Sequence, residues 1–478
     1  MDLSLEQTGQ LIAALLMVFV LFSAALAVPA RIAIAALIVL IPFQPIETQY
    51  GSANVVLTYA LCGALILSGR TLRMPMLASL LAIILAYLLS TSQTHASTYV
   101  QHSIYIFLLF SSFVVFYLVY NFARELDDAR FAVNVLIVSN LFVLLVCVLQ
   151  VYSGLSERFS FFGFDELQLH RIRADERLSG PFGAAGVTAE YLMLMLFILS
   201  YDLMHAVGRR RIFVLALIAA NLGTLLSTGN RGAFLTMIAM FPLYLYMFRN
   251  KLGTRKVVRI FVVAAVLLTG VSTVVIGYSD LGHMYERLAR LTETQGFIPE
   301  TRSVTWPTAW ENIKDKPLIG HGPRLRLMDD AETAYEGHVV IPYPHSLYLY
   351  LLFTVGVVGT TMFLAFLGRL GWQVLTAARA VGSSTYRAGF VRLGPLLLLA
   401  ILVDQIKIEF LRIGFVDYSH FLFCLFGLML GFAHRELEEQ SGRQTSASTI
   451  SKPAHGRLAL GYSQRIKASG EPLGSNLV

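Results

Sequence analysis

The sequence predicts an all-α, polytopic integral membrane protein with 12-13 transmembrane helices and one large periplasmic loop insert. Of its 478 residues, 56% are hydrophobic and only 14% are charged, and the mean hydropathy is +0.65. A soluble domain is about a quarter charged. The low charged fraction therefore indicates that the lipid bilayer, rather than a large protein core, covers the apolar side chains.

The individual helices are predicted from apolar runs of about 20 residues, the length that crosses a bilayer. These runs fall near 10–28, 54–68, 75–89, 103–120, 131–150, 186–206, 212–226, 232–248, 260–278, 346–367, 393–408 and 414–433. A shorter run at 31–43, which follows a turn at Pro29, supplies one more helix.

The loops between these helices differ in charge. Alternate loops carry most of the Lys and Arg residues, whereas the short loops between them hold only Arg231 and Arg412. Because basic loops face the cytoplasm, the inserts at 151–185 and 279–345 are expected on the outer face. The acidic N-terminus is then outside with thirteen helices and inside with twelve. The segment after residue 434 is rich in Ser, Gly, Lys and Arg, and a disordered cytoplasmic tail is expected there.

Composition also argues against several functions. The net charge is +7, but the basic residues punctuate the apolar runs instead of forming a stripe, so nucleic acid is not an expected partner. The three cysteines lie in separate apolar runs, which argues against disulfides and a cysteine metal site. No basic segment precedes the first apolar run, so no cleavable signal is expected.

The insert at 279–345 carries the most distinctive polar residues. It holds RSVTWPTAW at 302–310 and PLIGHG at 317–322, and the chain re-enters apolar sequence through YPHSLYLYLL at 343–352. A water-facing segment of this size between long apolar runs is expected to contribute half of an active site.

Arg231 is the main candidate elsewhere on the same face. It follows Asn230, in a stretch of residues that start helices, at the outer end of the run 232–248. A guanidinium beside the free N–H groups of a helix start suits a phosphate or diphosphate. An arginine that merely reaches the membrane interface is the alternative interpretation.

Arg302 and His345 are the candidates within the large insert. Arg302 precedes a helical pattern at 304–313, in which two tryptophans favour the membrane interface; a solvated loop arginine is the alternative. His345 begins the run 346–367, and an imidazole exchanges protons near neutral pH. A histidine at a helix start also serves as a cap, and this alternative stays open.

The smaller insert contains Arg177, which a turn at Gly180-Pro181 would bring to the start of the next helix; local salt bridges are the alternative. No metal-binding or nucleotide-binding motif stands out, so no metal and no cofactor is expected. Cationic side chains would then carry the charge of a phosphorylated donor.

Asp404, Lys407 and Glu409 lie in or beside an apolar helix near the end of the chain. Asp404 and Lys407 are three residues apart and can pair on one helix face. A buried structural pair is the expected role, and a polar cavity lining is the alternative.

The ordered set STGNRGAF, RSVTWPTAWENIKDKPLIGHG and PHSLYLYLLFTVGVVG resembles the O-antigen ligase and polysaccharide polymerase superfamily of bacterial membrane glycosyltransferases. The resemblance covers about residues 170–370, and RLSGPFGAAGVTAEYL resembles the motif that precedes the domain in many members. Ala185-Gly186 stands where Pro-Asn is commoner, and Ser346 stands where Asn is frequent.

The resemblance implies transfer of a glycan from an undecaprenyl-diphosphate carrier to an acceptor hydroxyl at the periplasmic face of the bacterial inner membrane. His345 matches the family's catalytic histidine, and Arg231 and Arg302 match its donor-binding arginines. Arg177 is placed with them as a further residue for the diphosphate. The expected reaction is an inverting, metal-independent displacement.

The resemblance also divides the chain into regions. These are N-terminal transmembrane helices at 1–150, a ligase- or polymerase-like catalytic core at 151–370, C-terminal transmembrane helices at 371–433 and the tail at 434–478. The donor, an acceptor, the lipid bilayer and other polysaccharide assembly and export proteins are the expected partners.

The acceptor decides between two enzymes of this superfamily. A polymerase of O-antigen or exopolysaccharide repeats extends another lipid-linked repeat, whereas an O-antigen ligase attaches polymer to lipid A core or to protein. The long insert favours the polymerase. A transporter of polysaccharide or lipid-linked glycan is the rival outside the enzymes, but it would place charges at mid-membrane on broken helices, often with an internal repeat.

Overall fold

The computed structural model describes residues 20, 22–24, 26–43, 47–48, 51–152, 178–252, 300–323, 334–335, 338–339, 343–381 and 385–450. Its helices are α2 (Ala30–Leu40), α3 (Ala53–Leu67), α4 (Leu77–Thr91), η1 (Ala96–Thr98), α5 (Tyr99–Glu125), α6 (Ala129–Tyr152), α7 (Ala185–Leu203), α8 (Gly208–Ser227), α9 (Arg231–Met247), α10 (Arg249–Leu252), α13 (Glu300–Asp315), α14 (Leu347–Ala380), α15 (Tyr386–Asp404), η5 (Ile413–Phe415) and α16 (Val416–Ile450). Two short antiparallel pairs complete it: β1 (Glu47–Thr48) with β2 (Gly51–Ser52), and β3 (Ala334–Tyr335) with β4 (His338–Val339).

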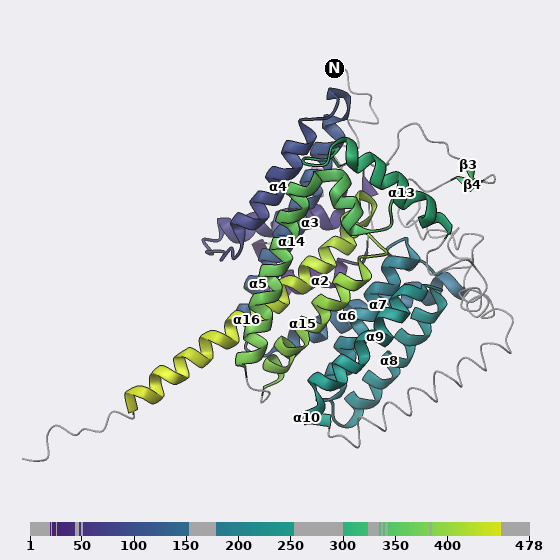
Figure 1. The fold of residues 1–478 in the computed structure, drawn as a ribbon. Coiled ribbons are helices and arrows are strands. Elements are labelled where there is room, and N and C mark those ends of the chain that lie inside the picture. Colours follow the sequence, from purple (N-terminus) through teal and green to yellow (C-terminus); the bar gives the residue numbers. More distant parts are fainter. Residues whose placement is uncertain are drawn as a thin grey trace, which may run out of the picture.

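The helices form one bundle, and the prediction of an all-α membrane protein is confirmed (Figure 1). In the described part of the chain, seven helices are long and apolar enough to cross a membrane, namely α5, α6, α7, α8, α14, α15 and α16. Four shorter apolar helices, α2, α3, α4 and α9, accompany them. The run 260–278 and most of the run 10–28 lie outside the described residues, so the total of 12-13 spans stays a prediction.

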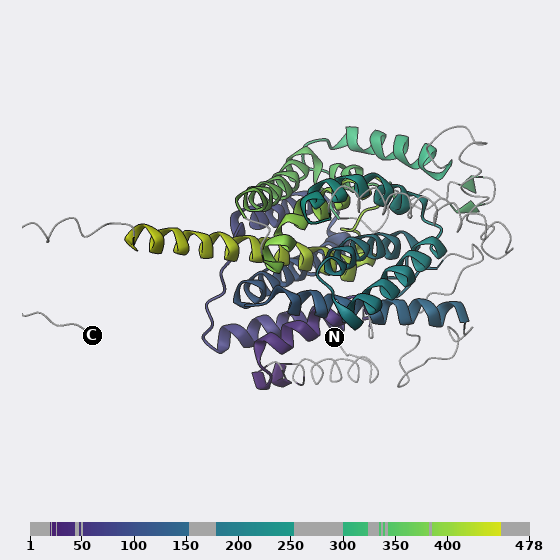
Figure 2. The ribbon, with the colours of Figure 1, turned by 90° about the horizontal axis from the view of Figure 1, so that it is seen from below.

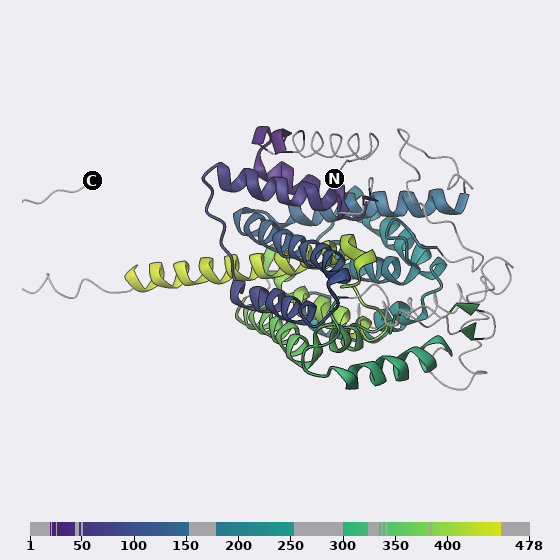
Figure 3. The same ribbon diagram turned by 90° about the horizontal axis from the view of Figure 1, so that it is seen from above.

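α16 runs through the middle of the bundle beside α5 and continues well beyond it (Figures 2 and 3). Two glycines of α16 allow this close packing. A methyl group on Gly427 would lie 2.7 Å from the carbonyl oxygen of Phe116, and one on Gly431 would lie 2.7 Å from that of Tyr120. Small residues at such positions let helix backbones approach in a membrane, where packing rather than hydrophobicity holds helices together.

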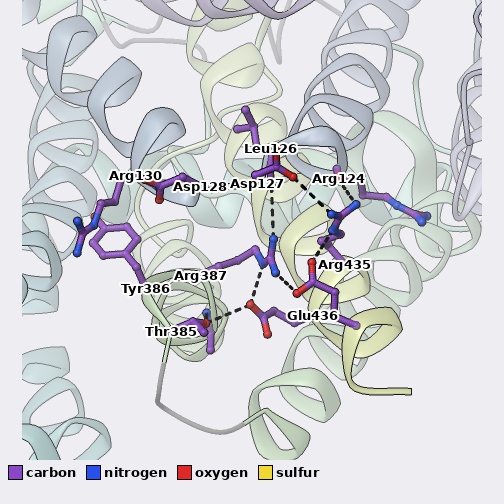
Figure 4. A network of polar contacts seen from close by, with 12 residues as sticks. Arg124, Leu126, Asp127, Asp128, Arg130, Thr385, Tyr386, Arg387, Arg435 and Glu436 are labelled. Carbon is purple, nitrogen blue, oxygen red and sulfur yellow. Dashed lines mark hydrogen bonds and ion pairs between the residues drawn. The ribbon is translucent and has the colours of Figure 1, made fainter. Parts of the chain in front are cut away.

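A network of charged side chains ties the end of α5 and the start of α15 to the middle of α16 (Figure 4). The buried guanidinium of Arg387, on α15, donates from Nε to Glu436 on α16 at 2.7 Å and from Nη1 to the carbonyl of Leu126 at 3.4 Å. Arg435 donates to the carbonyl of Arg124 at 3.3 Å. Two of the basic stretches that the sequence predicts to be cytoplasmic, those after α5 and at the start of α15, therefore meet at this end of the bundle.

The same three helices have their other ends around the sequence-predicted site residues. The hydroxyl of Tyr105, near the start of α5, donates to the carbonyl of Leu411 at 2.7 Å, just before α16 begins. α15, which starts in the charged network, ends at Asp404. These two basic stretches and the candidate site thus lie at opposite ends of the bundle.

Two predicted boundaries need correction. α15 begins at Tyr386 rather than near residue 393, so Arg387 and Arg392 belong to a helix and not to a loop. α16 continues to Ile450, so the first part of the predicted disordered tail is helical. An ion pair between Arg435 and Glu439, 2.7 Å apart and one turn along α16, helps to extend this helix.

Candidate active site

α14 is interrupted close to its N-terminal end. Gly356 has a φ of 62° and a ψ of −169°, which is not helical and which favours glycine. The amide groups that follow the break cannot bond within the helix. Those of Val357 and Val358 donate instead to the carbonyls of Pro317 and Leu318, at 2.8 and 3.2 Å.

The reverse exchange completes a main-chain joint between α14 and the segment PLIGHG. The amides of His321 and Gly322 donate to the carbonyls of Phe353 and Thr354, at 2.8 and 2.9 Å. A methyl group on Gly356 would overlap the backbone of this segment. These glycines belong to the stretches that carry the family resemblance, and in the structure they allow the insert to dock on α14.

This joint positions α13, the helix that carries Arg302. Ala309 and Ile313 of α13 are buried against Phe353 of α14. The indole Nε1 of Trp306 donates to the carbonyl of Pro344 at 2.7 Å, which fixes the backbone directly before the next candidate residue. α13 extends the helical pattern predicted for 304–313 by a few residues at each end.

His345 lies in the turn before α14 with a φ of 48°. This left-handed conformation is uncommon outside glycine and is typical of functional sites. The side chain is 27% exposed, and its Nδ1 atom lies 3.8 Å from Oε1 of Glu409. The pKa of His345 is lowered to about 4, chiefly by burial and also by the nearby cations Arg412 and Arg302. The imidazole is therefore neutral at neutral pH and able to accept a proton.

Glu409 is entirely buried, and its two carboxylate oxygens have no hydrogen-bond partner among the described residues. Arg412 is its second neighbour, with Nη1 3.8 Å from Oε1. The guanidinium of Arg412 also lies 3.6 Å above the ring of Tyr343. Burial raises the pKa of Glu409 to about 7, although Arg412 and Arg302 oppose the shift.

Arg302, on α13, reaches the cluster formed by His345, Glu409 and Arg412. Its Nη2 atom donates to the carbonyl of Lys407 at 3.0 Å. Burial lowers its pKa, and the carboxylates of Glu409 and Asp404 oppose that shift. Because an arginine stays charged in proteins, Arg302 brings a fixed positive charge close to His345.

Arg231 lies at the edge of the same cluster. It is the first residue of α9, and Asn230 caps the helix by accepting a hydrogen bond from the amide of Ala233 at 3.1 Å. The Nζ atom of Lys407 donates to Oδ1 of Asn230 at 3.4 Å and lies 2.6 Å from Oδ1 of Asp404. The expected buried Asp404–Lys407 pair is thus confirmed, and it adjoins the start of α9.

The structure therefore brings Arg302 and His345 together. Arg231 directly follows Asn230, which contacts Lys407. Arg177 lies outside the described residues, as does most of the insert at 279–345. Their predicted contributions stay predictions.

The sequence does not predict Arg412 as a site residue, and for Glu409 it offers a polar cavity lining with Asp404 and Lys407 only as the alternative. Glu409 and Arg412 belong to the short segment between α15 and α16, and their charges lie three residues apart between two apolar runs. Charged residues that re-enter a membrane-facing bundle are usually functional, so this spacing was the available signal.

The cluster combines a neutral imidazole, a buried carboxylate and several cations. Such a set can bind an anionic group and accept a proton from a neighbouring hydroxyl. Among the described residues, no group of three or more His, Cys, Asp or Glu side chains is placed to hold a metal ion.

Comparison with known proteins places this cluster in a family context. Residues 191–364 match the family model described as O-antigen ligase (Wzy_C). This region contains Arg231, Arg302 and His345, whereas Lys407 and Glu409 lie beyond it. No curated protein matches the chain. The chain is thus a multi-pass membrane protein that carries an O-antigen ligase family domain over residues 191–364.

Proposed function

We propose that the protein is a membrane glycosyltransferase that moves a glycan from an undecaprenyl-diphosphate carrier to an acceptor hydroxyl at the periplasmic face. One observation carries the proposal. A neutral His345 and the charged Arg302, which come from segments that the family model also covers, lie in one polar cluster beside the start of α9. The family implies a lipid-linked glycan as substrate.

In the proposed reaction, the oxygen of the acceptor hydroxyl attacks the anomeric carbon of the donor glycan. The bond between that carbon and the diphosphate oxygen breaks, and the diphosphate leaves with the electron pair. Attack from the opposite side inverts the anomeric configuration. Arg231 and Arg302, with Arg177 as a further candidate, hold the diphosphate and stabilise its growing charge.

His345 accepts the proton of the acceptor hydroxyl. Its depressed pKa of about 4 keeps the ring neutral and available. Glu409 is the positioning partner, because a carboxylate beside Nδ1 favours the tautomer in which Nδ1 carries the proton and Nε2 is free. Diphosphate is a good leaving group, so neither a metal nor a cofactor is required in this scheme.

The periplasmic placement is supported by charge. Two basic stretches, after α5 and at the start of α15, meet at one end of the bundle and the candidate residues lie at the other, and basic loops normally face the cytoplasm.

The direct test is glycan transfer by the purified protein in lipid nanodiscs with a lipid-linked donor. His345→Ala is expected to lower kcat by about 100-fold or more, the usual contribution of a general base. Arg231→Ala is expected to raise the donor KM. Transfer at the wild-type rate by either correctly inserted variant would contradict the assignment. Movement of donor across the bilayer without a bond change would identify a transporter instead.

Within this reaction we favour a polymerase of O-antigen or exopolysaccharide repeats, because the polar insert is long. The name of the matched family, O-antigen ligase, favours transfer of polymer to lipid A core or protein as the second candidate. The product that accumulates in a deletion strain separates them. Single-repeat glycan indicates a lost polymerase, and full-length lipid-linked chains indicate a lost ligase.

A further inference from the structure

Lys407 contacts Arg302 itself and the residue directly before Arg231. These two proposed donor-binding arginines come from distant parts of the chain. The carbonyl of Lys407 accepts the hydrogen bond from Nη2 of Arg302 at 3.0 Å. Its Nζ atom donates to Oδ1 of Asn230 at 3.4 Å, and Asn230 is the cap directly before Arg231. One residue therefore links α13 to the start of α9.

The side chain of Lys407 has little freedom. Its Nζ atom lies 2.6 Å from Oδ1 of the fully buried Asp404, and only 15% of the side chain is exposed. Its methylene chain passes over the first turn of α9 at Gly232. A methyl group at position 232 would overlap the Cδ, Cε and Nζ atoms of Lys407. The absence of a side chain at 232 therefore makes the room that the lysine occupies.

The net charge around the lysine distinguishes a structural link from a group that binds the substrate. A helix N-terminus is positive, so an ammonium group beside α9 would by itself be unfavourable. The carboxylate of Asp404 offsets it, and the pair carries no net charge. The pair therefore does not neutralise the charge of a bound diphosphate, which is left to Arg231 and Arg302. It fixes the positions of these two arginines instead.

We propose that Lys407 is a positioning residue that sets the separation of Arg231 and Arg302 and thereby the affinity for the diphosphate of the donor. The link runs from Asp404 through the ammonium to Asn230, and through the Lys407 carbonyl to Arg302. This inference rests on the proposed function, since it concerns the same donor site.

The test compares the KM for donor with the KM for acceptor in the full-length protein in nanodiscs. Lys407→Met is expected to raise the donor KM by about 10- to 100-fold, the cost of misplacing binding groups by an ångström, and to leave the acceptor KM within about twofold. Lys314→Met is the matched control, because Lys314 forms an exposed pair with Glu311 on α13 and is expected to change neither constant.

Removal of Lys407 alone leaves the buried Asp404 without a partner, which destabilises proteins strongly. The double variant Asp404→Asn/Lys407→Met avoids this and is expected to retain the raised donor KM. Gly232→Ala is expected to raise the donor KM in the wild-type chain, by displacing the lysine, but to have no further effect in a Lys407→Ala chain. Such non-additivity identifies contact between the two positions.

The outcomes are distinguishable. An unchanged donor KM in Asp404→Asn/Lys407→Met, an equal rise in both KM values, or an unfolded double variant would overturn the positioning role. If Arg231→Ala and Arg302→Ala themselves leave the donor KM unchanged, the proposed donor site is wrong rather than the role of Lys407 within it.

Discussion

The Nδ1 atom of His345 lies 3.8 Å from the Oε1 atom of Glu409, which places a partly exposed imidazole beside a fully buried carboxylate. His345 directly precedes α14, whereas Glu409 lies in the connection between α15 and α16. Their pKa values shift in opposite directions, to about 4 for His345 and about 7 for Glu409. Only the carboxylate therefore titrates near neutral pH.

This difference predicts the pH dependence of glycan transfer. The rate is expected to rise with pH through about 7. Burial raises the pKa of Glu409 to about 7, and the ionised carboxylate orients the imidazole of His345. His345 is already neutral on both sides of this step, since its pKa is about 4. Glu409→Gln is expected to abolish the step and to lower kcat by about tenfold or more.

The measurement is kcat between pH 5.5 and about 8.5, a range in which the proposed base is always neutral. Glu311→Gln is the control, because Glu311 is an exposed residue of α13, and it is expected to keep the wild-type profile. A step near pH 7 that persists in Glu409→Gln would assign the titration to another group.

The planar shape of the guanidinium groups of Arg231 and Arg302, as well as their charge, is expected to contribute to donor binding. Arg302→Lys keeps the positive charge but loses the planar donor fork that binds phosphate oxygens in pairs. We expect a donor KM raised by about tenfold, or roughly 1.4 kcal/mol, with the acceptor KM unchanged. Arg70→Lys is a suitable control, since Arg70 forms an exposed ion pair with Glu125 at 3.2 Å at the opposite end of the bundle. Full donor affinity in Arg302→Lys would rule out a forked contact.

Gly356→Ala is expected to destabilise the protein through the backbone rather than through a lost side-chain contact. A residue with a side chain would be strained at a φ of 62°, and its methyl group would overlap the segment that docks there. We expect a loss of about 1–3 kcal/mol, measured as a lower melting temperature in detergent. Gly368→Ala on the same helix is the control, because a methyl group there meets no atom within 4 Å. It should be neutral or slightly stabilising. Equal melting temperatures for the two variants would contradict the role of Gly356 in docking the PLIGHG segment on α14.

The orientation of the bundle is testable by labelling. A cysteine introduced by Trp310→Cys, on the half-exposed face of α13, is expected to react with a membrane-impermeant maleimide in cells whose outer membrane is permeabilised. One introduced by Arg70→Cys is expected to react only after the inner membrane is broken. The native cysteines Cys147 and Cys424 are buried and provide an unreactive background together with a Cys62→Ser change. The reverse labelling pattern would place the site in the cytoplasm.

Most of the helices could be predicted because a bilayer demands apolar runs of a fixed length. The start of α15 could not be predicted in this way. Arg387 and Arg392 interrupt its apolar run, and they fit in a helix only because partners such as Glu436 lie on another helix. Contacts between distant segments leave no local pattern in one sequence.

The same limit applies to the site. Arg231, Arg302 and His345 could be selected from local sequence and resemblance, because each begins or precedes a helix in a polar stretch. The place of Glu409 beside His345 could not be predicted, since it depends on folding that brings the two side chains within 3.8 Å. The contact of Lys407 with Asn230 is equally invisible from either stretch alone.

The docking of PLIGHG on the interrupted α14 has a wider consequence. The joint is made by amide and carbonyl groups together with glycines, so it depends little on which other side chains the docked segment carries. Under the proposed function, such a joint would let the choice of acceptor change while the catalytic groups keep their places.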